Sequence, residues 1–108
     1  MKETKREIKI ATEFGKYPAG RYQTDGPYNG EEFRKKFLEP SLKEKIQLKI
    51  HLDGTRGYGS SFLEEAFGGL VRAGFEKNFV LNSLEFVSQK ESLIIEITDY
   101  IKESKPDE

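Results

Sequence analysis

The sequence predicts an α/β domain with a mixed or mostly parallel sheet of about four strands and about three main helices on one face. Strand-like and helix-like segments alternate along the chain, an order that favours parallel strands joined by right-handed crossovers. Each predicted strand alternates apolar with charged residues, whereas parallel strands covered on both faces are apolar throughout. The second face of the sheet should therefore be open or covered by a partner.

Length and composition indicate a single domain, residues 1–108, with no cofactor or metal site expected. Hydrophobic residues make up 35% of the 108 residues and charged residues 34%, so helices should be amphipathic around one core. The 18 basic and 19 acidic side chains leave a net charge of −1, which predicts no nucleic-acid or membrane partner. The absence of cysteine excludes disulfides, thiolate metal sites and thiol catalysis.

The chain carries no apolar run near the roughly 20 residues that a membrane span needs. Its first ten residues, MKETKREIKI, are charged and lead into a strand, unlike a signal peptide. We therefore expect a soluble cytoplasmic protein. The polar ends, residues 1–5 and 104–108, should be frayed.

The first predicted strand contains Ile8 and Ile10, which flank Lys9. A glycine- and aromatic-rich connection over residues 14–30 follows. It is expected to include a short second strand near residues 21–23, because a structureless link of that length is unusual in so small a domain.

A first main helix should begin after Asn29, a favoured N-cap residue with Glu32 three positions later. This helix would bury Phe33 and Phe37. Pro40 should kink it or end its regular part, because proline lacks the backbone donor that a helix interior needs.

Residues 46–52 form the most regular predicted strand, alternating Ile or Leu with polar residues. Asp53 and Gly54 should end this strand. Gly54, Gly57 and Gly59 permit backbone angles that other residues resist, so a tight turn is expected before the next helix.

The second main helix is expected over residues 61–73, opened by a capping box between Ser61 and Glu64. Gly68 and Gly69 interrupt it at a cost of up to about 1 kcal/mol each relative to alanine. They indicate either close packing against the sheet or the approach of a partner, and packing is the favoured interpretation.

A further strand is expected around residues 84–87, where Leu84 and Phe86 alternate with Glu85. A final helix should then present one apolar stripe, formed by Leu93, Ile94, Ile97, Tyr100 and Ile101. The predicted core consists of Ile8, Ile10, Phe33, Phe37, Leu48, Ile50, Phe62, Ala66, Phe67, Leu84, Phe86, Ile97 and Ile101.

Ser60 and Ser61 lie where a strand leads into a helix N-terminus, a position that favours helix capping and also added negative charge. Capping alone is the more common role.

Tyr58 could be either a core residue or an exposed anchor. Arg21 could bind a phosphate or carboxylate, although a structural ion pair with Asp25 or Glu31 is more common. The lone histidine, His51, is expected to be a solvated strand residue.

The motifs resemble those of the STAS-like domain family of unknown function. They cover nearly the whole chain, and the last of them is specific. The matching segments are Pro18-Ala19-Gly20-Arg21, Asp25-Gly26-Pro27, Asn29-Gly30-Glu31-Glu32-Phe33-Arg34, and Asp53-Gly54 through Gly57-Tyr58-Gly59-Ser60-Ser61-Phe62-Leu63-Glu64-Glu65-Ala66-Phe67-Gly68-Gly69-Leu70.

The resemblance implies a fold similar to STAS domains, which include bacterial anti-sigma factor antagonists. In those proteins a GHKL-type ATPase phosphorylates a serine at a strand-to-helix turn, within an Asp-Ser-Ser-Gly pattern. Ser60 occupies the comparable place here, with Gly59 instead of the acidic residue and Phe62 instead of the glycine. The resemblance therefore implies that Ser60 is the phosphoacceptor and that a GHKL-type kinase is the partner.

Three functions follow, in order of preference. The first is a non-enzymatic regulatory module that binds a protein partner and is switched by phosphorylation of Ser60. The residues expected to contact the partner or a ligand are Arg21, Arg56, Tyr58, Gly59, Ser61, Glu64, Glu65 and Arg72. The alternative is a small-ligand, nucleotide or anion site at the glycine turn and helix N-terminus, although no GxxxxGK[ST] motif is present. An enzyme with Ser60 as nucleophile is least favoured, because no G-x-S-x-G elbow is present.

Overall fold

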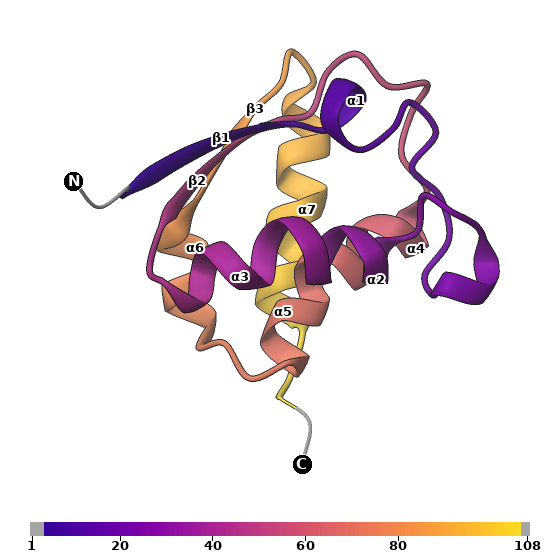
Figure 1. The fold of residues 1–108 in the computed structure, drawn as a ribbon. Helices are drawn as coiled ribbons and strands as arrows, with labels where there is room; N and C mark the ends of the chain where they lie inside the picture. The colour runs from indigo at the N-terminus through magenta and orange to yellow at the C-terminus, as the bar shows by residue number, and fades with distance from the viewer. Residues whose placement is uncertain (1–3, 107–108) are drawn as a thin grey trace.

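The computed structural model describes residues 4–106, which form one sheet covered by helices (Figure 1). The strands are β1 (Lys5–Lys9), β2 (Gln47–His51) and β3 (Leu84–Val87). The helices are α1 (Ile10–Glu13), the 3₁₀ helix η1 (Gln23–Asp25), α2 (Gly30–Phe33), α3 (Glu39–Lys43), α4 (Ser60–Leu63), α5 (Gly69–Arg72), α6 (Lys77–Ser83) and α7 (Glu91–Glu103). Two π-helical segments, η2 (Arg34–Leu38) and η3 (Glu64–Gly68), join their neighbours into continuous helical stretches over residues 30–43 and 60–72.

The sheet of the described residues has three strands, in the order β1-β2-β3, and both pairings are parallel. Ile8 pairs with Ile50, which in turn pairs with Phe86. The sheet was predicted to be mixed or mostly parallel, and the parallel alternative is confirmed, whereas the predicted four strands are wrong. The strand expected near residues 21–23 is replaced by η1, because the carboxylate of Asp25 accepts the backbone N–H groups of Arg21 and Tyr22 at 3.1 and 2.8 Å and curls the chain locally.

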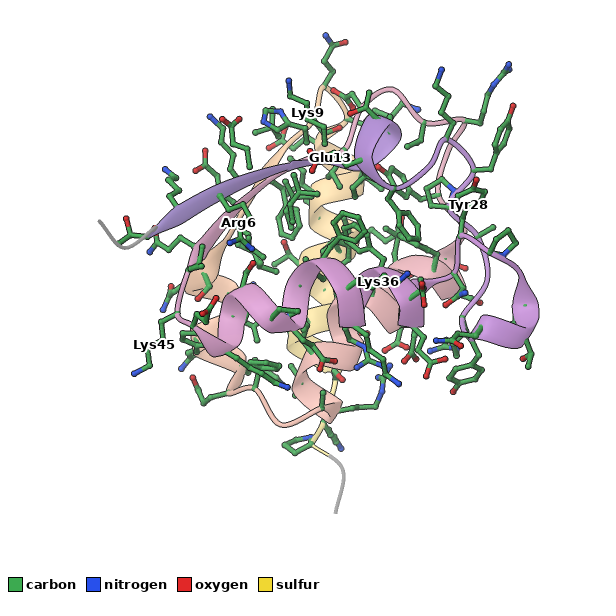
Figure 2. All side chains as sticks on the ribbon, in the orientation of Figure 1. Arg6, Lys9, Glu13, Tyr28, Lys36 and Lys45 are labelled. Carbon is green, nitrogen blue, oxygen red and sulfur yellow. The ribbon has the colours of Figure 1, made fainter. Side chains whose placement is uncertain are left out.

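The helices α2 to α7 lie on one side of this sheet (Figure 1). Figure 2 shows Arg6 on the helix side, where its guanidinium donates to Ser41 Oγ at 2.5 Å. On the other face Lys9 and Glu85 are exposed, and His51 Nε2 lies 2.6 Å from Glu7 Oε1. In the described part of the chain, the face expected to be open is therefore polar and carries no helix (Figure 1).

The core lies between the sheet and the helices and matches the predicted set closely. Eleven of the thirteen predicted residues are buried, and Phe37 and Phe86 are partly buried against them. Aromatic rings fill much of this volume: Phe33 stacks on Phe37 with centroids 5.2 Å apart, and Phe67 meets Phe86 edge-on at 5.4 Å.

The helical stretch over residues 30–43 begins as expected, since the Asn29 side chain accepts the backbone N–H of Glu32 at 2.8 Å. Pro40 does not end it. The preceding turn is π-helical, and the backbone N–H of Glu39 donates to the carbonyl of Arg34, five residues back. We infer that this wider turn accommodates the proline ring, which would otherwise crowd a carbonyl one turn earlier.

The stretch over residues 60–72 begins one residue earlier than predicted. Its N-cap is Gly59 (φ −68°, ψ 140°), so the predicted Ser61–Glu64 capping box is wrong. Glycines allow other parts of the molecule to approach this stretch closely. A Cβ at Gly68 would lie 2.7 Å from Glu64 Oε2, and one at Gly69 would lie 2.8 Å from Arg34 Nε. These glycines are closely packed, as the favoured interpretation predicted, but the predicted partner is wrong: the neighbours are Glu64, Tyr100 and Arg34 on helical stretches, and not the sheet.

Two short helices, α1 and α6, have no counterpart among the elements expected from the sequence. At the chain ends, Lys5 belongs to β1 and Ser104 is buried, with its hydroxyl donating to the carbonyl of Gly68 at 2.8 Å. The predicted frayed ends are thus wrong at these two positions, while residues 1–3 and 107–108 lie outside the described part. Within residues 4–106, no helix has the length and apolar character to cross a bilayer.

Candidate functional site

The candidate site is built on the turn that follows β2. Gly54 and Gly57 have φ angles of +100° and +122°, which a residue with a side chain adopts only under strain. The turn is attached to the long connection before α2: the backbone N–H of Arg56 donates to the carbonyl of Lys16 at 2.8 Å, and that of Gly59 donates to the carbonyl of Pro18 at 3.3 Å. The predicted tight glycine turn is confirmed, and its neighbour is the 16–18 segment.

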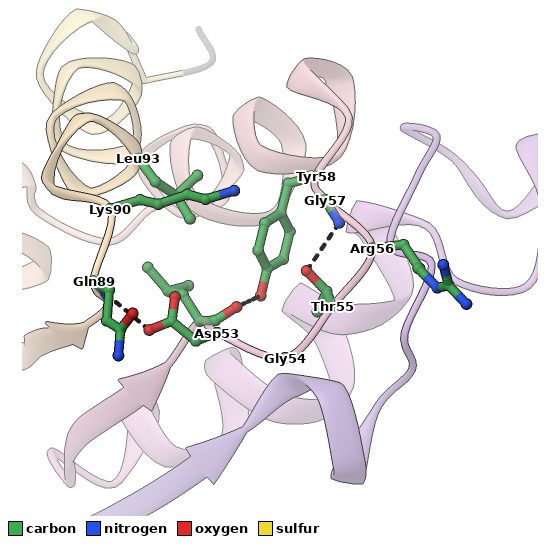
Figure 3. A pocket seen from close by; sticks show the side chains of 10 residues that line it. Asp53, Gly54, Thr55, Arg56, Gly57, Tyr58, Gln89, Lys90 and Leu93 are labelled. Carbon is green, nitrogen blue, oxygen red and sulfur yellow. Dashed lines mark hydrogen bonds between the residues drawn. The ribbon is translucent and has the colours of Figure 1, made fainter.

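Tyr58 is a half-buried structural residue in this turn. Its hydroxyl donates to the carbonyl of Leu52 at 2.6 Å, and its ring centroid lies 6.0 Å from that of Phe62. Burial raises the pKa of the hydroxyl to about 12. Figure 3 shows the ring standing as one wall of a hollow between the turn and the start of α7.

Asp53 joins the end of β2 to the loop after β3, a role that the sequence did not reveal. Its carboxylate accepts the Ser88 hydroxyl at 2.7 Å and the backbone N–H of Gln89 at 2.8 Å. These two hydrogen bonds, with that of Ser88 the larger cause, lower the pKa of Asp53 below its ordinary value. The two loops at this end of the sheet are thereby fixed relative to each other.

A cavity of about 320 Å³ lies between these two loops (Figure 3). Its lining residues are Leu52, Asp53, Gly54, Thr55, Arg56, Gly57, Tyr58, Gln89, Lys90 and Leu93. It occupies the carboxyl ends of β2 and β3, the edge at which open α/β sheets bind their ligands. Neither Ser60 nor Ser61 belongs to this lining.

Ser60 and Ser61 are the first two residues of the 60–72 stretch, and both side chains are exposed. Neither is the N-cap residue, since that position belongs to Gly59. Ser60 therefore lies at the solvent-accessible position that was predicted for it, but the cap role predicted for one of the two serines is wrong.

An exposed aromatic side chain, that of Tyr17, lies beside the turn that precedes the serines. The guanidinium of Arg56 lies over the ring of Tyr17, 5.9 Å from its centroid, and Tyr17 is 60% exposed. Tyr17 was not predicted as a site residue, because only the backbone pairing between residues 16–18 and 56–59 brings it to the turn. Gly59 is packed against the same connection, since a Cβ placed on it would lie 3.6 Å from the Cα of Ala19, an ordinary van der Waals contact.

Four of the five charged residues predicted for the contact surface, all except Arg56, lie in an ion-pair cluster. It contains three arginines and three glutamates: Arg21, Arg34, Arg72, Glu39, Glu64 and Glu65. Arg72 binds both oxygens of Glu64, at 2.7 and 2.8 Å. Arg34 Nη2 donates to Glu65 Oε2 at 2.9 Å, and Arg34 also pairs with Glu39. The charges of the cluster balance internally.

The capping box does not form because the helix begins at Ser60 with Gly59 as its N-cap, and the carboxylate of Glu64 is paired with arginines. Burial by itself would raise the pKa of Glu64, but hydrogen bonds from Arg72 and Arg21 outweigh it and hold the pKa below its ordinary value. Arg21 has the structural role expected of it, but its side-chain partners are Glu64 and Glu65 instead of Asp25 or Glu31. Glu65 is only 5% exposed, which corrects its expected place at the rim of a contact surface.

A known protein family matches the part of the chain that contains the turn and the serines. The family model described as a STAS-like domain of unknown function (DUF4325) matches residues 29–93, which include the turn, both serines and most of the ion-pair cluster. No curated protein and no solved structure matches the chain.

Proposed function

Because the chain belongs to the family of STAS-like domains of unknown function, we propose that it is a non-enzymatic regulatory module that binds a protein partner. The contact surface, called here the turn surface, consists of Tyr17, Arg56, Gly59, Ser60 and Ser61. The proposed switch is phosphorylation of Ser60. The proposed partner is a GHKL-type ATPase, as the resemblance to anti-sigma factor antagonists implies, in a cytoplasmic setting.

The observation that carries the proposal is the solvent access of the two serines without a capping role. The oxygen of a capping hydroxyl would accept a hydrogen bond from a backbone N–H group of the first turn. Ser60 is instead accessible to solvent at the first residue of a helical stretch. The Tyr17–Arg56 pair on the same turn supplies an aromatic and an arginine, the residue types enriched in protein interfaces.

The charge balance of the cluster bears on how such a switch would act. A phosphate adds about −1.5 to −2 charges at neutral pH. Glu64, one helical turn beyond Ser60, is already paired with Arg21 and Arg72. The phosphate therefore does not face a free carboxylate, and its main effect would be a new negative charge on the turn surface, where Arg56 is the cation of the proposed contact.

The test is mass spectrometry of the protein isolated from its own cells, together with incubation of the pure protein with ATP and a candidate ATPase. We expect one phosphate at Ser60. Ser92 is the matched control, because it is an exposed serine in the first turn of another helix, α7. Equal labelling of Ser92, or no labelling of Ser60, contradicts the switch.

Binding to the partner then separates the switch from a structural role. Ser60→Asp and Arg56→Glu should weaken binding, while Lys105→Glu, at an exposed position outside the turn surface, should leave it unchanged. None of the three variants should alter the melting temperature appreciably. If Ser60→Ala instead lowers the unfolding free energy by about 1 kcal/mol without affecting the partner, Ser60 has a local structural role and the proposal loses its switch.

A further inference from the structure

We propose that the cavity between the 53–58 turn and the start of α7 binds a small organic anion that carries a flat apolar body. This inference does not depend on the partner proposal, because the cavity lining includes neither Ser60 nor Ser61. Its location at the carboxyl ends of parallel strands is the usual ligand position in open α/β sheets.

Most polar side chains of the lining are already engaged. The carboxylate of Asp53 binds Ser88 and Gln89, and the Tyr58 hydroxyl binds the carbonyl of Leu52. Thr55 Oγ1 accepts the backbone N–H of Gly57 at 3.2 Å. Arg56 lies over Tyr17, and Figure 3 shows its side chain extending away from the cavity. These groups shape the cavity, and the negative charge of Asp53, whose pKa is lowered, is directed toward Ser88 and Gln89 (Figure 3).

Lys90 is the charged group that remains for a ligand. Figure 3 shows its side chain crossing the cavity mouth toward Tyr58. Within residues 4–106 its ammonium makes no hydrogen bond or ion pair, in contrast to the carboxylate of Asp53 on the opposite side. An ammonium is a compact donor that attracts carboxylate or phosphate groups. At the cavity mouth, the charge of Lys90 therefore favours an anion.

The remaining lining favours a flat apolar body attached to that anion. Leu52 is 1% exposed and Leu93 is half-buried. The Tyr58 ring is fixed by its hydroxyl, so its free face can stack on another ring. A volume of about 320 Å³ is at the lower end of the range for ligand pockets, which suits a ligand of one ring. Because Asp53 and Tyr58 already hold both loops, little ordering remains to oppose binding.

The experiment is a titration of the isotope-labelled protein with benzoate, followed by backbone amide NMR signals. We expect shifts confined to residues 52–58 and 89–93. Benzamide, the neutral molecule of nearly the same shape, should bind up to about fivefold more weakly than benzoate, which is the upper limit for an exposed charge pair. Inorganic phosphate, the anion without a ring, should also bind more weakly than benzoate.

Variants test the residue assignment. Lys90→Met should remove the preference for benzoate over benzamide, while Lys105→Met, at an exposed lysine outside the cavity, should retain it. Unchanged signals elsewhere establish that the Lys90→Met protein is folded. Ser60→Asp should bind benzoate like the parent chain, which keeps this result separate from the partner proposal. Shifts scattered over the surface, equal binding of benzamide, or full binding by Lys90→Met would overturn the inference.

Discussion

The buried ion pair between Arg34 and Glu65 offers the sharpest test of the structure. Glu65 is 5% exposed and Arg34 is 8% exposed, and Arg34 Nε is buried without a hydrogen-bond partner among the described residues. The perturbation is Glu65→Met, which keeps the length of the side chain and removes its charge. Arg34 would then depend on Glu39 alone for compensation.

The expected loss follows from burial. Removing one member of a buried pair costs about 3–5 kcal/mol, because the other charge remains without compensation. Here Glu39 stays beside Arg34, so the loss should fall near the lower end, about 3 kcal/mol. Glu31→Met is the matched control, because Glu31 forms a more exposed i,i+4 pair with Lys35, for which about 0.3–0.5 kcal/mol is typical.

Urea unfolding measures both values, through the midpoint and the slope of the transition. The double variant Arg34→Met/Glu65→Met should lose less than the sum of the two single variants, because each single variant leaves one member of the Arg34–Glu65 pair without its partner and the double variant removes both. The carboxylate of Glu39 loses its arginine equally in the Arg34→Met single variant and in the double variant. A loss of unfolding free energy below about 1 kcal/mol for Glu65→Met, comparable to the control, would refute the buried cluster and would indicate that Glu65 is a surface residue.

Two further predictions concern single residues. Lys45 follows the 30–43 stretch with a φ of +60°, a backbone conformation that favours glycine. Lys45→Gly should therefore raise the unfolding free energy by about 0.5–1 kcal/mol. Lys43→Gly, inside the helix, should lower the unfolding free energy by up to about 1 kcal/mol in the same urea assay. The paired Glu64 has a lowered pKa, so its contribution to stability is complete above the ordinary value of 4.5 and is lost as the pH falls through the folded-state value. Urea midpoints between pH 6 and pH 3 should therefore fall less steeply for Glu64→Gln than for the parent chain, and parallel curves would contradict this assignment.

Features set by neighbouring residues could be predicted from the sequence. The period-two alternation of residues 46–52 placed β2 and the open sheet face, because side chains of a strand alternate between its two faces. Asn29 marked a helix start, because its side chain reaches a backbone N–H only three residues away. The three glycines of the 53–59 segment marked the turn. The solvent-accessible position of Ser60 followed from these local signals.

Features that depend on residues distant in sequence could only be seen in the tertiary structure. Ser61 and Glu64 satisfy the local pattern of a capping box, but the helix begins one residue earlier, with Gly59 as N-cap, and Glu64 is paired with Arg21 and Arg72. The residues near 21–23 could have been a strand, and the hydrogen bonds of Asp25 curl them into a 3₁₀ turn instead.

The cavity likewise arises from folding. Folding places Tyr58 and Lys90 in one cavity lining and forms the hydrogen bond from the Ser88 hydroxyl to the carboxylate of Asp53. The sequence by itself determined the α/β class, the main helices, the glycine turn and most of the core, because hydrophobic periodicity and turn preferences act within a few residues. The tertiary structure decided the number of strands, the pairing of the charges and the shape of the cavity, because these depend on which distant groups reach one another when the core closes.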